Sequence, residues 1–277
     1  MTGAPGLPLP ADRLVRLLTG FLREEAAKAG FGRLVVGVSG GIDSALALLL
    51  AVRAIAPERV LALMMPYRSS SPESVRHAEE VIERAGCPSE LLDITPMVDA
   101  FRQVAGCDDP LRLGNKMARE RMTLLYDRAM RDGALVVGTS NKTELLLGYS
   151  TRWGDGAHDL NPLGDLYKGQ VRALAAHLDC PPSILSKAPS ADLVPGQTDE
   201  EDLGLTYEEA DRILHYLVDL GGRPERAAEA LGVADETVRR VVRRVVRSQF
   251  KRLPPIICKV QARTIGIDFR FPRDWGV

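Results

Sequence analysis

The sequence lacks the cysteine spacing of a zinc site or of a disulfide framework. Its four cysteines are far apart and none forms a CxxC pair. Structural zinc sites and small disulfide-linked folds need closely spaced or regularly paired cysteines, so the pattern argues against both. We expect ordinary reduced thiols at all four positions, which are Cys87, Cys107, Cys180 and Cys258.

Long hydrophobic runs, a secretory leader and an excess of one charge are missing as well. No apolar stretch approaches the roughly 20 residues that span a bilayer. Residues 1–10 show no basic start followed by an apolar core. The formal net charge is −1, so no global field favours nucleic acid or an anionic membrane. We therefore expect a cytoplasmic protein with no membrane partner and no nucleic-acid partner.

The composition that remains is that of an ordinary globular protein. Of its 277 residues 45% are hydrophobic and 26% are charged, which is enough to bury a large core without cross-links. We expect a flexible N-terminus over residues 1–11 and a single domain over 12–277. Within it, a sheet core should occupy about 12–190, and a helical region with a tail should occupy about 191–277.

The first half of the chain alternates short apolar runs with helical patterns. The runs are of the continuous kind found in buried parallel strands, and helix-length segments of periodic polarity separate them. This order predicts a doubly wound α/β fold, with a parallel sheet and helices on both faces. The expected strands are Leu34–Val38, Val60–Met65, Glu90–Ile94 and Ala134–Gly138, and the expected helices are 14–29, 45–55, 73–85 and 115–131.

The second half of the chain lacks this alternation of apolar runs and helical patterns. Residues 148–164 and 188–205 are rich in polar residues and predict loops, whereas residues 167–178 and 207–252 predict helices. We therefore expect a C-terminal helical extension of the sheet core.

The loop after the first strand is the most informative segment. Residues 37–45 read GVSGGIDSA, between an apolar strand and an Ala/Leu-rich helix. Adjacent glycines let backbone N–H groups close on an anion, and the helix N-terminus adds positive potential. Ser39 and Ser44 can donate further hydrogen bonds. The loop is neither a Walker A motif nor a GxGxxG fingerprint, but its chemistry still predicts a phosphate site.

The aspartate in this predicted phosphate loop is unexpected, because the carboxylate of Asp43 would repel a bare phosphate. A cation between carboxylate and phosphate removes the conflict, and Mg²⁺ commonly takes one or two carboxylates together with phosphate oxygens. The alternative is a tight turn in which Asp43 or a serine only caps the helix. A cap alone does not require the two preceding glycines.

The motif SGGIDS at 39–44 resembles the pyrophosphate loop of the N-type ATP pyrophosphatases, whose fold is similar to the adenine nucleotide alpha hydrolases. These enzymes split ATP into AMP and pyrophosphate while they activate an oxygen as an adenylate. Further stretches, in order, resemble the NAD synthetases within that superfamily. They are MPYRSSSPES at 65–74, GTSNKTE at 138–144, GYSTRWGDG at 148–156, KAPSADL at 187–193, PGQTDEE at 195–201, and KR followed by PP at 251–255.

The resemblance implies a ligase that joins ammonia to the nicotinate carboxylate of deamido-NAD. ATP would first convert the carboxylate into an acyl adenylate, and ammonia would then displace AMP. By resemblance Asp43 and Lys168 are catalytic, and Asp43 and Glu144 hold Mg²⁺. The residues expected to bind ATP are Gly37, Val38, Ser39, Gly40, Gly41, Ile42, Asp43, Ser44, Thr139, Lys168 and Ser190.

Four further positions match contacts of these enzymes with the dinucleotide: Arg119, Arg152, Asp159 and Lys251. Arg152 stands where many members have lysine, and a guanidinium fork binds differently from a point charge. Phe250 replaces a frequent histidine, which removes a polar contact from this corner. Tyr149 and Trp153 could stack on the nicotinate ring or simply pack.

Two other functions compete with this hypothesis. Residues 223–247 resemble a helix-turn-helix, with Gly232 at the turn and many arginines, which would suit DNA. A stripe of valines on one side and arginines on the other is also explained by a packed helix with a solvated basic face, and seven acids lie between Asp199 and Asp211 to neutralise it. The enzymatic rival is a tRNA-modifying pyrophosphatase, and the missing CxxC pair argues against its sulfur-transferring versions.

The resemblance also bears on partners. It implies a homodimer with deamido-NAD at the subunit interface, and the helices after the third strand could supply that interface. Glutamine-using members carry a fused glutaminase domain about as long as this sequence, for which we find no segment. We therefore expect direct use of ammonia, and a separate glutaminase protein stays an open alternative.

Overall fold

The sheet consists of parallel strands in the order β3-β2-β1-β4, as the sequence predicts. The computed structural model describes residues 5–187 and 199–265. The chain winds from β1 outward to β3 and then crosses to the other side of β1, so a switch point lies between β1 and β4. The strands are β1 Arg33–Gly37, β2 Val60–Met64, β3 Ser89–Leu91 and β4 Ala134–Val137.

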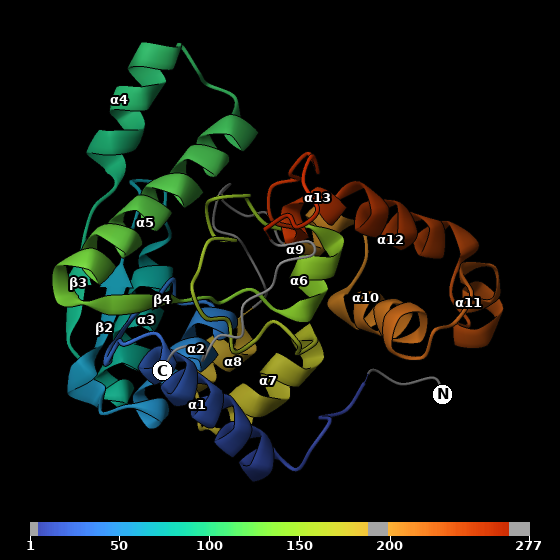
Figure 1. Cartoon of the computed structure of the whole chain (residues 1–277), viewed down its shortest axis with the longest axis horizontal. Coiled ribbons are helices and arrows are strands. Elements are labelled where there is room, and N and C mark those ends of the chain that lie inside the picture. The colour runs from blue at the N-terminus through green and yellow to red at the C-terminus, as the bar shows by residue number, and fades with distance from the viewer. Residues whose placement is uncertain (1–4, 188–198, 266–277) are drawn as a thin grey trace.

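Helices cover both faces of this sheet. On one face lie α1, α2, α3 and α7, and on the other lie α4 and α5 (Figure 1). Side chains along β1 alternate between these two faces. Leu34 and Val36 pack with the helices of the first face, whereas Val35 packs with the helices of the second. The bounds are α1 Ala11–Lys28, α2 Ile42–Ala54, α3 Pro72–Ala85, α4 Thr95–Ala105, α5 Pro110–Asp132 and α7 Lys168–His177.

A separate group of helices packs beside the sheet rather than on it. Its core is formed by apolar side chains of α6, α9, α10, α11 and α12, and Figure 1 shows α10 to α12 at the opposite end of the molecule from α4. The bounds are α6 Lys142–Leu147, α9 Asp199–Leu203, α10 Tyr207–Leu214, α11 Pro224–Leu231, α12 Asp235–Arg247 and α13 Gln249–Arg252, while the short helix α8, Pro182–Ser186, packs with the sheet core.

Some predicted boundaries differ from the structure. The third strand ends at Leu91, and Asp93 accepts a hydrogen bond from the Thr95 amide at 2.8 Å, where the unpredicted helix α4 begins. Helix α5 begins at Pro110, well before the predicted residue 115, because the Asp109 side chain caps it. Helix α5 has weak apolar periodicity, which explains its late predicted boundary, whereas α4 is amphipathic and its omission has no such reason.

The helical stretch predicted for 207–252 is interrupted. Gly221 and Gly232 both have φ of +64°, a left-handed conformation that ends a helix. The turn predicted at Gly232 is therefore confirmed, and the structure divides the stretch into α10, α11, α12 and α13, with a π-helical turn at His215–Asp219. In the described part of the chain we find no helix with the length and apolarity required to cross a bilayer.

Candidate active site

The loop between β1 and α2 is closed by its own serines. The Ser44 hydroxyl accepts from the Ser39 amide at 3.2 Å and donates to the Gly41 carbonyl at 2.9 Å. No side chain caps α2, so neither Asp43 nor a serine satisfies the first amides of this helix. The capping alternative is thereby excluded, and the amides at this N-terminus remain suited to an anion.

Gly40 explains why the loop needs glycine. Its φ is +77°, and a Cβ at this position would lie 2.1 Å from the carbonyl oxygen of Ser74 on α3. Any side chain would therefore both strain the backbone and push α3 away. The close approach of α3 determines the shape of the loop. Two neighbours of the loop are core residues, since Val38 is 3% exposed and Ile42 is 7% exposed.

Three predicted residues meet at the switch point of the sheet. Asp43 follows β1, Glu144 follows β4, and Lys168 begins α7. The Lys168 Nζ atom lies 2.5 Å from Asp43 Oδ2 and 3.2 Å from Glu144 Oε1. Lys168 is buried, whereas the side chains of Asp43 and Glu144 are partly exposed, at 18% and 16%. Ligands of open parallel sheets bind at this location.

Asn141 links the two carboxylates, a role that was not predicted from the sequence. Its side-chain amide donates to Asp43 Oδ1 at 2.8 Å, and its backbone amide donates to Glu144 Oε2 at 3.3 Å. Its side-chain oxygen also accepts from the Glu144 amide at 3.0 Å, which completes a capping box at the start of α6. An asparagine three residues before a glutamate was the available sequence signal.

The electrostatics of the cluster follow from burial and proximity. Burial, with the neighbouring Asp43 next in importance, raises the pKa of Glu144 to about 8. Burial alone would lower the pKa of Lys168, but Asp43 and Glu144 outweigh it, so the pKa lies above its ordinary value. Lys168 therefore carries a positive charge near neutral pH, and a further cation beside Glu144 would favour the ionised carboxylate.

The donor set fits a magnesium ion that shares its ligands with a phosphate. Asp43 and Glu144 supply carboxylate oxygens, which are hard ligands of the kind that Mg²⁺ prefers. Within residues 5–187 and 199–265 no group of three or more His, Cys, Asp or Glu residues could hold a metal ion. Asp43 and Glu144 are the carboxylates that would hold the ion, with phosphate and water oxygens as further ligands.

The other predicted ATP residues lie near the same edge of the sheet. Gly37 is the last residue of β1, where a Cβ would meet the Met65 methyl at 3.3 Å. Thr139 lies two residues after the end of β4 and is half-buried. Ser190 lies outside the described residues. Two strand ends thus contribute to the site, as the parallel order requires.

Arg152 and Lys251, two of the four residues predicted to contact the dinucleotide, lie close to Phe250. The Arg152 guanidinium lies between two aromatic rings, 5.0 Å from the centre of Trp153 and 5.6 Å from that of Phe250. The Lys251 Nζ atom donates to the carbonyls of Gly148 and Ser150 at 2.7 and 2.6 Å. Lys251 thus connects α13 to the 148–164 loop.

Asp159 and Arg119, the other two residues predicted to contact the dinucleotide, have different surroundings. Asp159 is held by protein groups, because it accepts from the Val136 amide at 2.8 Å and from the Tyr126 hydroxyl at 3.2 Å. Arg119 is an exposed residue of α5. Of the two aromatic candidates, Tyr149 donates its hydroxyl to Asp199 and Asp202, whereas the Trp153 ring is 53% exposed.

Comparison with known proteins decides the family. The family model of NAD synthase matches residues 14–255, which is most of the chain. An NH(3)-dependent NAD(+) synthetase of Chlorobium phaeovibrioides is 55% identical over 269 residues, and the match covers 97% of each chain. The chain belongs to the NAD synthase family.

Solved structures agree with this assignment. An NMN synthetase from Francisella tularensis has a TM-score of 0.81 at 34% identity, covering 90% of this chain and 99% of the other. The NH3-dependent NAD synthetase from Campylobacter jejuni, solved with a nitrate ion, has a TM-score of 0.78 at 30% identity, covering 91% and 100%. The predicted α/β fold of an ATP-using NAD synthase is thereby confirmed.

The basic helix α12 has structural partners in this NAD synthase. Arg244 donates to the Asp202 carbonyl at 3.0 Å, and Arg240 reaches the Gly204 carbonyl, so α12 binds the end of α9. Arg243 pairs with Glu236 on its own helix. Val238 and Val241 are buried on the opposite side of α12. These contacts and the family together argue against the DNA-binding hypothesis.

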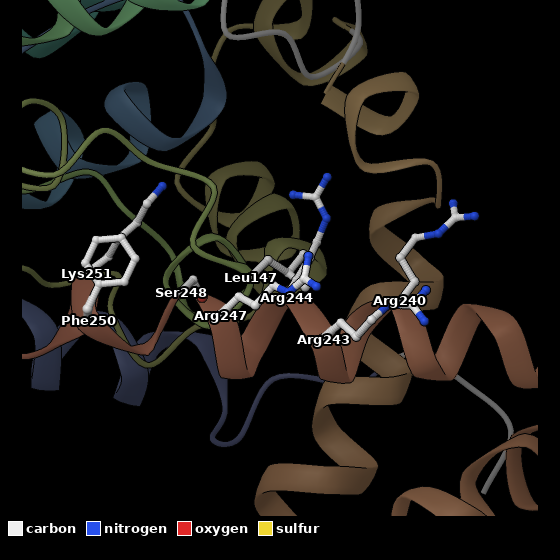
Figure 2. A pocket seen from close by; sticks show the side chains of 8 residues that line it. All are labelled: Leu147, Arg240, Arg243, Arg244, Arg247, Ser248, Phe250 and Lys251. Carbon is white, nitrogen blue, oxygen red and sulfur yellow. The ribbon is translucent and has the colours of Figure 1, made fainter.

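A pocket of about 260 Å³ lies between α12 and the Phe250–Lys251 corner. Figure 2 shows arginines of α12 along one side of it and Phe250 and Lys251 at the other end. The lining residues are Leu147, Arg240, Arg243, Arg244, Arg247, Ser248, Phe250 and Lys251. Of the cations that line it, Arg240, Arg243, Arg244 and Lys251 already have partners within the protein.

Proposed function

We propose that this NAD synthase performs the ATP-dependent amidation of deamido-NAD with ammonia, releasing AMP and pyrophosphate. The observation that carries the proposal is the buried cluster of Asp43, Glu144 and Lys168 beside a glycine-rich loop at a helix N-terminus. The relative named NH(3)-dependent NAD(+) synthetase, 97% of which this chain covers, supports the choice of acceptor and of nitrogen source.

The first chemical step brings several negative groups together. The nicotinate carboxylate attacks the α-phosphorus of ATP, the bond to the β-phosphate bridging oxygen breaks, and pyrophosphate leaves with that electron pair. Lys168 would stabilise the negative charge that develops on the phosphates, and the amides of the Ser39–Ser44 loop would hold the leaving pyrophosphate. A Mg²⁺ ion held by Asp43 and Glu144 would neutralise phosphate charge and orient the oxygens.

The second step is the attack of ammonia on the acyl adenylate. The ammonia nitrogen forms a bond to the carbonyl carbon, the bond to the AMP oxygen breaks, and the surplus proton leaves to solvent or phosphate. The acyl adenylate must be shielded from water, and the buried position of Lys168 is consistent with such shielding. We propose free ammonia as the nitrogen source, with a separate glutaminase as the alternative supplier.

For the dinucleotide we propose contacts to Arg119, Arg152, Asp159 and Lys251. Arg152 is the best supported, because the rings of Trp153 and Phe250 lie close to its guanidinium. A guanidinium beside aromatic rings suits a phosphate or a carboxylate. Thr139 and Ser190 are proposed ATP contacts.

We also propose a homodimer. Large apolar side chains are exposed on α4 and α5, and more lie on the segment after α13. Surfaces of this kind commonly pair with a second copy of the same chain. The most exposed members are Val104, Leu111, Met130, Ile256, Val260 and Ile265.

A second acceptor deserves a direct comparison, because the Francisella tularensis structure of similar fold is described as an NMN synthetase. Nicotinate mononucleotide carries the same carboxylate but lacks the adenylyl half. The same adenylating chemistry would therefore apply to both acceptors, and contacts with that half would decide between them.

One assay tests the proposal. The purified protein is mixed with Mg-ATP, an acceptor and either ammonium or glutamine, and the products are followed by mass-resolved chromatography. We expect NAD, AMP and pyrophosphate from deamido-NAD with ammonium. Faster amidation of nicotinate mononucleotide would reassign the acceptor, and equal rates with glutamine would overturn the choice of ammonia. AMP formation without either amide would require another acceptor, with RNA tested first.

A further inference from the structure

Helix α10 presents two residues to the start of α7, where Lys168 lies. Tyr207 and Asp211 are four positions apart, so they occupy one face of α10, one turn from each other. Both are buried, at 5% and 1% exposed. Neither residue was singled out from the sequence, because a tyrosine and an aspartate in an amphipathic helix carry no distinctive pattern.

Asp211 connects the two helices that carry the catalytic cluster. Its Oδ1 accepts a short hydrogen bond from the Thr143 hydroxyl of α6 at 2.5 Å, and its Oδ2 accepts from the Gly169 amide of α7 at 2.8 Å. The Thr143 hydroxyl oxygen in turn accepts from the Lys168 amide at 3.1 Å. One buried carboxylate thus fixes the residue next to Glu144 and the residue next to Lys168.

Tyr207 contacts the other end of the lysine. The Lys168 Nζ atom lies 4.8 Å from the centre of the Tyr207 ring, within the range of a cation–π contact. The Tyr207 hydroxyl donates to Asp199 of α9 at 3.1 Å, which fixes the ring. The lysine is therefore held at its ammonium by Tyr207 and at its backbone by Asp211.

We infer that α10 is a positioning element of the active site, in which Asp211 and Tyr207 hold Lys168 in register with Asp43 and Glu144. The inference deepens the proposed function and rests on it for the role of Lys168. Burial of a carboxylate carries a large desolvation cost, and the hydrogen bonds from Thr143 and Gly169 offset that cost for Asp211. Asp211 is a positioning residue, since it reaches the reaction only through Thr143, Gly169 and Lys168.

The conservative variant Asp211→Asn tests the inference. An asparagine can accept only through its single oxygen, so either Thr143 or Gly169 loses its acceptor and faces an NH₂ group. A displacement of Lys168 by about 1 Å should lower kcat on the order of 100-fold. The KM for deamido-NAD should change less than about threefold. Asp211 contacts the start of α7 beside Lys168, and it is not among the residues around Arg152 that we propose to bind the dinucleotide.

A matched control separates positioning from stability. Glu90→Gln removes a carboxylate that accepts from Arg128 and Arg131 at the far edge of the sheet, both at 2.8 Å. It should lower the melting temperature without changing kcat per folded molecule. If Asp211→Asn behaves in the same way, with kcat per folded molecule unchanged, Asp211 is only structural and the inference fails.

The ring of Tyr207 is tested by a pair of variants. Tyr207→Phe keeps the ring and removes only the hydroxyl, so kcat should stay within about threefold of the wild type. Tyr207→Leu removes the ring, and kcat should fall about tenfold, which is the scale of a desolvated cation–π contact. Equal kcat in the two variants would remove Tyr207 from the positioning element.

Hydrogen–deuterium exchange gives a readout that needs no substrate. In Asp211→Asn the amides at the start of α7, residues 168–172, should exchange at least about tenfold faster, whereas those of α2 should not change. Unchanged exchange in α7 would overturn the inference even if NAD synthesis is confirmed. Faster exchange in a protein that makes no NAD would leave the positioning intact and overturn the proposed function instead.

Discussion

The Nζ atom of Lys168 lies 2.5 Å from Oδ2 of Asp43, although 125 positions separate the two residues in the chain. The contact joins the start of α7 to the loop after β1. It neutralises a carboxylate that would otherwise oppose a phosphate at the same loop. The charge balance of this loop therefore depends on a residue from a distant segment.

Asp43→Asn should abolish pyrophosphate release and leave the fold intact. The change keeps the shape of the side chain but removes the charge that faces Lys168 and the proposed metal. Pyrophosphate release is measured together with circular dichroism. The matched control is Asp12→Asn, since Asp12 is an exposed acid in the first turn of α1 and should be silent. Turnover above about a tenth of wild type would disprove the metal role of Asp43.

Removal of divalent cations should stop the reaction reversibly. Glu144→Gln should raise the Mg²⁺ concentration needed for half-maximal rate by about tenfold or more, because an amide is a weaker ligand than a carboxylate. Rates are measured over a Mg²⁺ titration after treatment with a chelator. An unchanged Mg²⁺ requirement in Glu144→Gln would leave Glu144 outside the metal site.

Gly40→Ala should disrupt the phosphate loop. The new Cβ would lie 2.1 Å from the Ser74 carbonyl oxygen, so the loop or α3 must move. We expect loss of ATP binding by calorimetry, with a lower melting temperature. Gly30→Ala is the control, because Gly30 has a similar φ of +81° but nothing within 4 Å of its Cβ. That variant carries only the backbone cost, roughly 1–2 kcal/mol, and should bind ATP normally.

Arg152→Ala should weaken deamido-NAD more than ATP. The substitution removes the guanidinium held between Trp153 and Phe250, which lies apart from the phosphate loop. The two KM values are measured separately, with Arg131→Ala as a control arginine that pairs with Glu90 and Asp132. Equal weakening of both substrates would remove Arg152 from the dinucleotide contacts.

Asp219→Asn should lower stability at neutral pH but not in acid. Burial alone would raise the pKa of Asp219, but hydrogen bonds from Lys142, Tyr167 and His215 outweigh it and lower the pKa to about 2. The ordinary value is 3.8, so the carboxylate stabilises the fold above about pH 4 and this contribution is lost as the pH falls toward 2.

Urea unfolding from pH 7 to pH 3 measures this effect. At pH 7 we expect a loss of about 1–2 kcal/mol, reduced from the full pKa shift because the side chain is partly exposed. Asp165→Asn is the control, since Asp165 pairs with the same Lys142 at 3.0 Å but is 94% exposed. A loss in Asp219→Asn that does not shrink in acid would contradict the assigned hydrogen bonds.

Much of the site could be predicted because its residues lie in segments that follow strands and that resemble motifs of the NAD synthetases. Asp43 comes after β1 and Glu144 after β4, and parallel strands bring their carboxyl ends to one edge. Asn141 had a local signal in its spacing from Glu144. Tyr207 and Asp211 had none, because α10 reaches the site through the packing of a separate helical cluster.

The sequence by itself determined the parallel α/β fold, the phosphate loop and the two acids above the sheet. These features depend on short-range patterns: apolar strands, glycines that permit φ of +77°, and helix starts that attract anions. Only the tertiary structure decided that Lys168 lies between the acids, that Phe250 and Trp153 enclose Arg152, and that Asp211 joins α6 to α7. Such contacts depend on how distant segments pack. The packing energy is shared among many side chains, and no pattern in the sequence shows which of them will be neighbours.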